Sequence, residues 1–465
     1  MADRPASPER RKAGQRAGGQ RPGKPADRAR RLAFDALRAV NGDGAFANLV
    51  LGRLLDERRL SARDAAFATE LVAGTCRRQG TYDLVLERAS GRPLGSLQPA
   101  VVDILRLGTH QLLGMRVPAH AAVGASVDLA AASVGQRVRG LVNAILRKVA
   151  ERDDDGWLTE LTDGLGEREA LAVRYAHPRW IVDAFAQVLP AGELVAALAA
   201  DNVSPVPTLA VRPGLADVAE LIEAGATPGR WSPYAAVWSG NPAALPPIAQ
   251  GRAGVQDEGS QLVTWGLTRP SADPGSWLDL CSGPGGKSAL LAGLAAERGG
   301  RLLSAELNPH RAALVAAALR AYPGPRPVVV VADGTRPAWR SGSFTRVLAD
   351  VPCTGLGALR RRPEARWRRA EADLDALVGL QEALLDSALD AAAPGGLVAY
   401  VTCSPHPRET VGIVRTVLAR RDAVSVVPAE EVLPGIPGST AGPFLQLWPH
   451  RHGTDAMFAA YLRRG

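Results

Sequence analysis

Short apolar runs alternate with helical stretches throughout the C-terminal half of this 465-residue chain. The runs are SWLDL (276–280), RLLSAEL (301–307), PVVVVAD (327–333), TRVLADVP (345–352) and GLVAYVTCS (396–404). Because they lack the polar alternation of half-exposed strands, they predict strands buried on both faces, as in a parallel, doubly wound α/β sheet. Ligands of such sheets bind beyond the carboxyl ends of the strands, so we expect the functional residues there.

The first third of the chain has a helical pattern instead. The stretch 137–149 places its apolar residues on one helical face, SARD (61–64) is a helix-capping box, and 99–115 forms a further helix that contains His110, expected in the core. We predict an all-α domain over 28–150. An acidic linker (151–170), a small α+β module (171–253) and the sheet domain (254–465) follow.

Residues 1–27 are predicted to form a disordered, basic tail. Residues 1–31 hold ten Arg or Lys against three Asp or Glu, most of the formal net charge of +8, and they lack the apolar core of a secretory signal. Such a tail attracts polyanions. No apolar run is long enough to span a membrane. Four cysteines without a CxxC spacing fit a reducing cytosol and argue against structural zinc, so we expect a cytoplasmic protein without metal.

The loop DLCSGPGGKS (279–288) follows the first apolar run and precedes a helix. Its end matches that of a phosphate-binding P-loop, but Cys281 stands where that motif needs its first glycine. A glycine-rich turn also admits the methionine part of S-adenosylmethionine, whose ribose and adenine would meet acids at the next strand ends. Glu306 and Asp333 end the second and third runs, and Asp350 follows at the fourth. The predicted cofactor contacts are these three acids with Cys281, Ser282, Gly283, Pro284, Gly285, Gly286 and Lys287.

Two more cysteines, Cys353 and Cys403, lie at the ends of the last two runs, and such a pair suits covalent catalysis on a base. A thiolate that adds to carbon-6 of cytosine makes carbon-5 enamine-like, so that carbon-5 can attack a methyl sulfonium. A second polar group then helps to remove the carbon-5 proton, and a carboxyl group at ring N3 helps the first addition. Cys403, Cys353 and Asp350 form such a set. Two interpretations stay open beside it: a Cys–His hydrolase that uses His406, and a pair of buried, inert thiols.

Six motifs resemble successive motifs of the RNA 5-methylcytosine methyltransferases, the Sun/Nop2 family. They are VQDEGSQ (255–261), DLCSGPGGKS (279–288), DVPCTGLGALRRRPEARW (350–367), LQEALLDSALDAAAPGG (380–396), YVTCSPHPRE (400–409) and LWPHRHGTDAMF (447–458). The resemblance covers about residues 170–465, and the helical domain resembles NusB-like RNA-binding domains. It implies a Rossmann-like domain that uses S-adenosylmethionine to methylate carbon-5 of a cytosine in RNA. The domain order implies 16S ribosomal RNA as the target.

The resemblance also implies roles for particular residues. Cys403 would be the nucleophile, and Cys353 would promote release of the product. DNA cytosine methyltransferases attack with the Pro-Cys cysteine and do not need the second, so Cys403 favours RNA. The arginines beside Cys353 are expected to face RNA phosphates; they are Arg360, Arg361, Arg362 and Arg366.

The chain departs from the family pattern at four places, none of which involves the two cysteines: two are Glu306, where the family commonly has Asp, and TLAVRP (208–213), a poor copy of its Leu-Arg-Val-Asn segment. It has Arg408-Glu409-Thr410 where the family usually has Glu-Glu-Asn, and Asp455-Ala456-Met457-Phe458 in place of Asp-Gly-Phe-Phe. We expect RNA as the partner of a monomeric enzyme. The alternatives are an RNA-binding ribosome-assembly factor without turnover, and the same chemistry on tRNA or another RNA.

Overall fold

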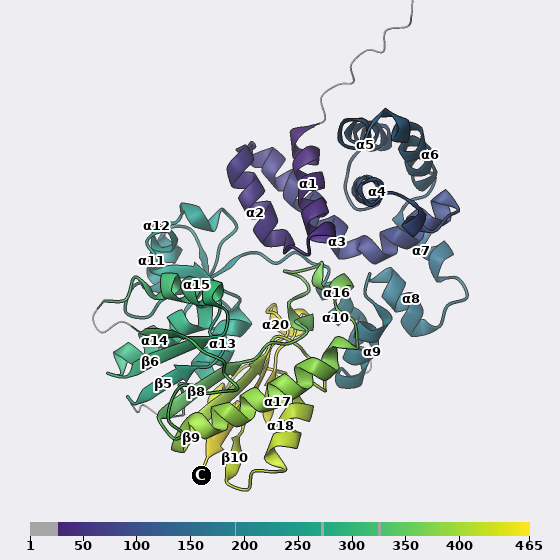
Figure 1. The fold of residues 1–465 in the computed structure, drawn as a ribbon. Helices are drawn as coiled ribbons and strands as arrows, with labels where there is room; N and C mark the ends of the chain where they lie inside the picture. The colour runs from purple at the N-terminus through teal and green to yellow at the C-terminus, as the bar shows by residue number, and fades with distance from the viewer. Residues whose placement is uncertain (1–26, 191, 271–273, 324–326) are drawn as a thin grey trace, which may run out of the picture.

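The computed structural model describes residues 27–190, 192–270, 274–323 and 327–465, which form three parts in chain order (Figure 1). The predicted basic tail lies outside the described residues, apart from Asp27. The Asp27 side chain accepts the Arg30 N–H and so caps the first helix.

The first part is a helical bundle, which confirms the predicted all-α architecture. The Ser61 side chain accepts the Asp64 N–H at the start of the third helix, as the capping box predicted. His110 is buried, as expected for a core residue, and Cys76 of α3 is buried as well. The helices are α1 (Arg28–Gly42), α2 (Ala47–Arg58), α3 (Ala62–Ser90), α4 (Pro99–Leu113), α5 (Ala119–Ser133) and α6 (Arg139–Val149), with short 3₁₀ turns at Leu94–Ser96 and Gln136–Val138.

The segment predicted as a linker, residues 151–170, is mostly helical instead. In α7 (Asp154–Thr162) the Trp157 ring is 1% exposed in the core of the bundle, and its Nε1–H donates to the Val149 carbonyl at 2.9 Å. The acidic composition favoured a linker, but burying one indole removes about 150–250 Å² from water and holds the segment on the bundle.

The middle part combines helices with a small antiparallel sheet in the order β2-β3-β1-β4, which agrees with the predicted α+β module. Phe185 and Leu198 of its helices share a hydrophobic core with Leu356 and Trp448 of the following domain, so the two parts pack as one body. The elements are α8 (Glu167–Arg174), α9 (Arg179–Val188), α10 (Leu194–Ala200), β1 (Thr208–Val211), α11 (Val218–Glu223), β2 (Thr227–Pro228), β3 (Ala235–Val237), a 3₁₀ turn (Pro242–Ala244), α12 (Pro246–Ala249) and β4 (Ala253–Val255).

The third part is an α/β domain on a nine-stranded sheet in the order β11-β12-β13-β9-β8-β5-β6-β7, with β10 paired to β13. All five predicted strands are present and parallel to one another: β5 (Ser276–Asp279), β6 (Arg301–Glu306), β7 (Val328–Val331), β8 (Phe344–Asp350) and β9 (Ala392–Thr402). The chain runs outward from β5 to β7 and then returns to β8. The switch point of this topology, where ligands bind, therefore lies between β5 and β8.

Helices cover both faces of this sheet (Figure 1). One face carries α13 (Glu258–Gly266), α14 (Gly286–Glu297) and α15 (Pro309–Leu319), and the other carries α17 (Asp373–Ala391) and α18 (Val411–Leu418). Shorter helical segments are a 3₁₀ turn (Leu356–Ala358), α16 (Ala365–Arg368), α19 (Ala429–Val432) and α20 (Pro449–His452).

Four antiparallel strands that the sequence analysis did not predict extend the sheet beyond β9. They are β10 (Val424–Val427), β11 (Thr440–Ala441), β12 (Phe444–Gln446) and β13 (Phe458–Arg464). Three of them are too short for a periodic signal. The longest, β13, contains two alanines and ends in two arginines, which lowers its strand propensity.

Residues 362–368, which follow the Cys353 loop, dock the α/β domain onto the helical bundle; we call them the docking segment. The Trp367 ring lies against Gly80 of α3, and its Nε1–H donates to the Cys76 carbonyl at 2.7 Å. A Cβ atom on Gly80 would lie only 2.3 Å from the Trp367 ring, so the close approach requires glycine.

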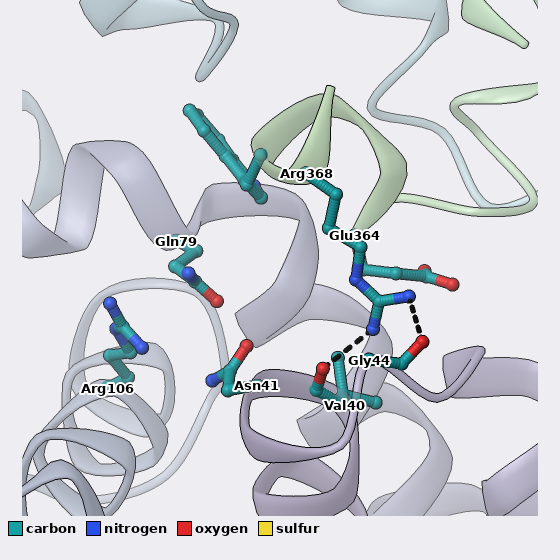
Figure 2. A pocket seen from close by; sticks show the side chains of 8 residues that line it. Val40, Asn41, Gly44, Gln79, Arg106, Glu364 and Arg368 are labelled. Carbon is teal, nitrogen blue, oxygen red and sulfur yellow. Dashed lines mark hydrogen bonds between the residues drawn. The ribbon is translucent and has the colours of Figure 1, made fainter. Parts of the chain in front are cut away.

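Two further side chains of the docking segment bind backbone groups of the bundle. Glu364 Oε1 accepts the Ala47 N–H at 3.1 Å at the N-terminus of α2, which has no capping side chain of its own. The Arg368 guanidinium donates to the Val40 carbonyl at 2.7 Å and the Gly44 carbonyl at 2.9 Å (Figure 2). These directional hydrogen bonds tie the bundle to the segment that follows Cys353.

Replacing Gly80 by Ala should weaken docking of the α/β domain on the helical bundle while both domains stay folded. The new methyl group favours the helix by up to about 1 kcal/mol, but it overlaps the Trp367 ring and opposes docking. We expect Gly80→Ala to unfold thermally in two transitions and to have a larger radius of gyration by X-ray scattering. Gly52→Ala on α2, where nothing lies within 4 Å of the new Cβ, is the control and should only stabilise. Identical behaviour of the two variants would contradict this account of docking.

Candidate active site

Cys353 and Cys403 meet at the carboxyl ends of the neighbouring strands β8 and β9. Their sulfur atoms are 3.4 Å apart, within hydrogen-bonding distance, and neither cysteine is in a disulfide. The hydrogen bond from the Cys353 thiol lowers the pKa of Cys403, whereas the same bond, together with burial, raises the pKa of Cys353. The pair therefore keeps its proton on Cys353, and Cys403 is the thiolate-forming member.

Lys287, at the end of the glycine loop, lies between these thiols and the end of β8. Its ammonium is 2.8 Å from Asp350 Oδ2. Burial opposes the charge, but the Asp350 carboxylate outweighs burial and raises the pKa of Lys287. The charged lysine in turn contributes to the lowered pKa of Cys403. A P-loop lysine reaches nucleotide phosphates, whereas the Asp350 carboxylate holds Lys287, which argues against the P-loop interpretation.

The loop between β5 and α14 fits closely against the next strand and helix. Gly285 has φ +110°, and a Cβ there would lie 2.9 Å from the Val315 backbone. A Cβ on Gly283 would lie 2.4 Å from Glu306 Oε2. Ser282 donates its N–H and its hydroxyl to the Ala305 carbonyl at 2.9 Å. Glycines at these positions keep backbone groups within reach of a ligand at the switch point.

The predicted cofactor acids gather beside this loop. Glu306 accepts the Gly283 N–H at 2.9 Å and the Asn308 N–H at 3.0 Å, one on each oxygen, and each oxygen keeps lone-pair capacity for a further donor such as a ribose hydroxyl. Asp333 accepts the N–H and hydroxyl of Thr335, which lower the pKa of this carboxyl. These donor and acceptor groups fit S-adenosylmethionine, and their assignment to it stays a prediction.

Asp279, at the end of β5, supports the loop from below and was not among the predicted site residues. It is fully buried, and its Oδ2 accepts the Ser288 hydroxyl at 2.6 Å. Burial raises the pKa of Asp279 to about 7. The sequence could have indicated Asp279 as a site residue, because it lies directly before the glycine-rich turn.

Glu409 clamps the Cys353 loop and was also not predicted as a site residue. Its carboxylate is buried and accepts the Thr354 N–H at 2.8 Å, the Thr354 hydroxyl at 2.5 Å and the Gln381 amide at 3.0 Å. Gln381 donates to the Pro352 carbonyl as well, at 2.8 Å. Both residues lie in motifs of the sequence. Glu409 is 55 residues from Thr354 and 28 from Gln381, and motif spacing does not show contacts between side chains so far apart in the chain.

Two of the four arginines expected to face RNA are occupied by carboxylates. Arg360 lies 2.9 Å from Asp455 and 3.0 Å from Asp257, and Arg361 contacts the same two acids at 3.0 and 2.5 Å. The expected phosphate contact is wrong for Arg360, which is only 8% exposed. Arg361 is committed to the same carboxylates, which compete with any phosphate.

The other two arginines differ sharply in exposure. Arg366 is fully buried and donates to the Ala176 carbonyl at 2.9 Å and to Asn202 Oδ1 at 2.8 Å, so the expected phosphate contact is wrong for it too. Burial lowers the pKa of Arg366 to about 10. Arg362 is exposed, with its guanidinium 5.3 Å from the centre of the Phe46 ring, and stays a candidate for RNA contact.

His406 does not form a dyad with Cys403. Its Nδ1 accepts the Arg408 N–H at 3.2 Å, and its ring packs 6.4 Å from the Trp180 ring. The hydrogen-bond partner of the Cys403 sulfur is Cys353, so the Cys–His hydrolase interpretation is wrong. Across the described ranges, no group of three or more His, Cys, Asp or Glu is arranged to hold a metal ion, and no helix is long and apolar enough to cross a membrane.

A doubly wound sheet with this glycine loop and these strand-end acids defines the class of S-adenosylmethionine-dependent methyltransferases. The family model described as 16S rRNA methyltransferase RsmB/F matches residues 268–463, and the NusB family model matches residues 27–151. The chain belongs to the RsmB/F family and is an RNA methyltransferase of that family. The resemblance to the Sun/Nop2 enzymes and to NusB-like domains is thereby confirmed.

Similarity to individual relatives extends over nearly the whole chain. A protein named putative methyltransferase Rv1407 from Mycobacterium tuberculosis is 50% identical over 452 residues, covering 95% of this chain and 97% of that protein. The probable ribosomal RNA small subunit methyltransferase B of Synechocystis is 31% identical, covering 94% and 99%. Among solved structures, PH0851 has the same fold, with a TM-score of 0.80 at 22% identity over 94% of this chain and 98% of that one.

The lowered pKa of Cys403 should be visible as alkylation at lower pH. Peptide mapping after iodoacetamide treatment is expected to give a half-maximal rate for Cys403 below the ordinary thiol pKa of about 8.5. Cys353→Ala removes the hydrogen bond, so the Cys403 midpoint should move to higher pH. Cys281, whose pKa is raised by burial, is the internal control and should react slowly throughout. An unmoved midpoint in Cys353→Ala would contradict the shared proton.

Removal of the whole Glu409 side chain should destabilise the protein more than removal of its charge alone. Glu409→Ala leaves the Thr354 N–H and the Gln381 amide buried without an acceptor, at a cost of about 1–3 kcal/mol for each group. Glu409→Gln keeps an acceptor for both donors and offers an N–H to the Thr354 hydroxyl, so about 1 kcal/mol should be lost. Urea unfolding of both variants measures the difference, and equal losses would rule out the clamp.

Proposed function

We propose that this protein transfers a methyl group from S-adenosylmethionine to carbon-5 of a cytosine in small-subunit ribosomal RNA, through a covalent bond between Cys403 and carbon-6. The observation that carries the proposal is the pair of thiols 3.4 Å apart beside the glycine loop. A protein that only binds RNA needs neither thiol, and one thiol held as the proton donor of the other suits addition followed by release.

The residues proposed to hold S-adenosylmethionine are the loop 281–287 with Glu306, Asp333 and Asp350. When bound, this group supplies an electrophilic methyl on a sulfonium sulfur. The backbone of the loop and the Glu306 carboxylate would orient it. Lys287 holds Asp350 on the thiol side of the site through its 2.8 Å contact.

In the proposed first step, the Cys403 thiolate forms a bond to carbon-6, and the electron pair of the 5,6 double bond moves into the ring. Asp350 would take up a proton from the Lys287 ammonium that contacts it and donate a hydrogen bond to ring N3, which stabilises this charge, and the proton would return to Lys287 when the charge is gone. Carbon-5 then bonds to the methyl carbon as the methyl–sulfur bond breaks, which leaves a neutral thioether as the by-product. The lowered pKa of Cys403 increases the fraction of the attacking thiolate at a given pH.

Release requires removal of the carbon-5 proton, and the coupling of the two thiols supports Cys353 as the base. The pKa of Cys353 is raised by its bond to Cys403, by burial and by the Cys403 charge. Glu409 and Asp350 raise it further. Once Cys403 is a thioether, both contributions from Cys403 are gone, so the pKa of Cys353 falls and loss of its proton becomes easier. As a thiolate it takes the carbon-5 proton, the double bond re-forms, the carbon–sulfur bond breaks and Cys403 leaves as a thiolate.

The choice of RNA rests on the domain composition and on the names of relatives. The NusB-like bundle and the α+β module would bind RNA, and the enzyme from Cronobacter sakazakii, 30% identical over 427 residues, is named ribosomal RNA small subunit methyltransferase B. A cytoplasmic location follows from such a target. A tRNA or another RNA remains the alternative substrate, and a ribosome-assembly factor without turnover remains the alternative function.

Trapping the covalent intermediate tests the proposal. Incubated with unmodified small-subunit RNA and S-adenosylmethionine, Cys353→Ala should accumulate a protein–RNA band on a denaturing gel, because addition proceeds and release stalls. The double variant Cys353→Ala/Cys403→Ala should give no band, and Cys403→Ala alone should transfer no methyl. Wild-type protein that binds this RNA but transfers no methyl to it or to tRNA would overturn the proposal in favour of an assembly factor.

A further inference from the structure

A cavity of about 360 Å³ lies where the docking segment meets the helical bundle (Figure 2). Its walls include Asn41, Gln79 and Arg106 from the bundle and Trp367 and Arg368 from the docking segment; we call it the junction cavity. Cavities between domains are common ligand sites, and this one joins the RNA-binding bundle to the chain that carries Cys353.

The side-chain amides in the junction cavity have hydrogen-bonding capacity to spare. Asn41 Nδ2 donates to Asp103 Oδ1 at 2.7 Å, which fixes the amide and leaves its carbonyl oxygen on the cavity side. No described residue hydrogen-bonds the Gln79 amide, and Figure 2 shows Gln79 and Asn41 facing each other across the cavity. Such amides pair with the donor and acceptor edge of a nucleobase.

The charges of the cavity favour a neutral ligand in its interior. Asp83 holds Arg106 through two contacts of 2.7 Å, and Asp103 lies 3.2 Å from the same guanidinium. The Arg368 guanidinium donates its N–H groups to backbone carbonyls. A phosphate inside would have to compete with these partners, whereas an uncharged base would not.

Positive charge and an aromatic ring lie beside the cavity on exposed residues. The guanidinium groups of Arg362 and Arg368 lie 5.3 and 6.0 Å from the centre of the Phe46 ring, which is 46% exposed. In the part of the chain that the structure describes, Arg362 has no carboxylate partner, so its charge is available to a phosphate.

We propose that the junction cavity binds one unpaired base of the RNA substrate, stacked on Trp367 and read at its edge by Gln79 and Asn41, with a flanking phosphate on Arg362. The inference rests on the proposed function and specifies where the RNA is held. Because Trp367 and Arg362 follow Cys353 within the same loop and segment, a base in the cavity would hold bundle and docking segment together. RNA capture and the placement of Cys353 would then depend on the same contacts.

Binding of a fluorescently labelled, unmodified small-subunit RNA fragment to the full chain tests the inference. Gln79→Ala removes an amide that makes no internal hydrogen bond, so folding should be preserved. The Kd and the KM for RNA should each rise about fivefold, with kcat and the salt dependence of binding unchanged. Gln136→Ala, at an exposed glutamine of the α5–α6 connection, is the matched control and should change neither.

Ultraviolet crosslinking of the same RNA gives an independent readout. Crosslinked nucleotides should map by mass spectrometry to the peptides that contain Gln79 and Trp367. Unchanged Kd for Gln79→Ala, or crosslinks confined to other peptides, overturns the inference, as does a wild-type protein that does not bind this RNA. The covalent band with Cys353→Ala is scored separately, so methyl transfer with normal Gln79→Ala binding would leave the proposed function intact and remove the cavity from it.

Discussion

Four buried or half-buried charges hold the Cys353 loop in place against the strands and helices around it. Asp257 caps α13, Asp455 precedes β13, and Arg360 and Arg361 follow the Cys353 loop. Charges removed from water cost several kcal/mol each unless all their partners are present. The cluster is therefore complete only when the C-terminal strands, α13 and the loop have assembled together. Burial, together with the nearby Asp257, raises the pKa of Asp455 to about 6.

Burial also affects the two thiols, Cys353 and Cys403. Cys353 and Cys403 are the same chemical group in one environment, yet their pKa values move in opposite directions because they share a single proton. The neighbouring charges add to this asymmetry. Lys287 and Arg362 lower the pKa of Cys403, whereas Glu409 raises the pKa of Cys353. Two like residues thus acquire different acidities from their mutual hydrogen bond and the surrounding charges.

The sequence was most informative where hydrophobic burial and motif order act together. The five parallel strands, the bundle and the three strand-end cysteines could be predicted because apolar runs and turn residues are local signals. The linker was mispredicted because one tryptophan, Trp157, outweighed an acidic composition. The arginines were mispredicted for a related reason: Arg360 and Arg366 find carboxylate and carbonyl partners from segments more than ninety residues away, and no local pattern encodes that pairing. Glu409 was missed on the same grounds.

The cap that Glu364 provides at α2 has a consequence for the modular history of such chains. A helix that takes its cap from another domain is less stable in an excised bundle, by about 1 kcal/mol, because the first turn of α2 would lose that acceptor. Recombination that exchanged the bundle would need to carry a compatible docking segment with it. The two coding regions are therefore expected to be inherited as a matched pair, although the polypeptide between them is long enough to suggest independent units.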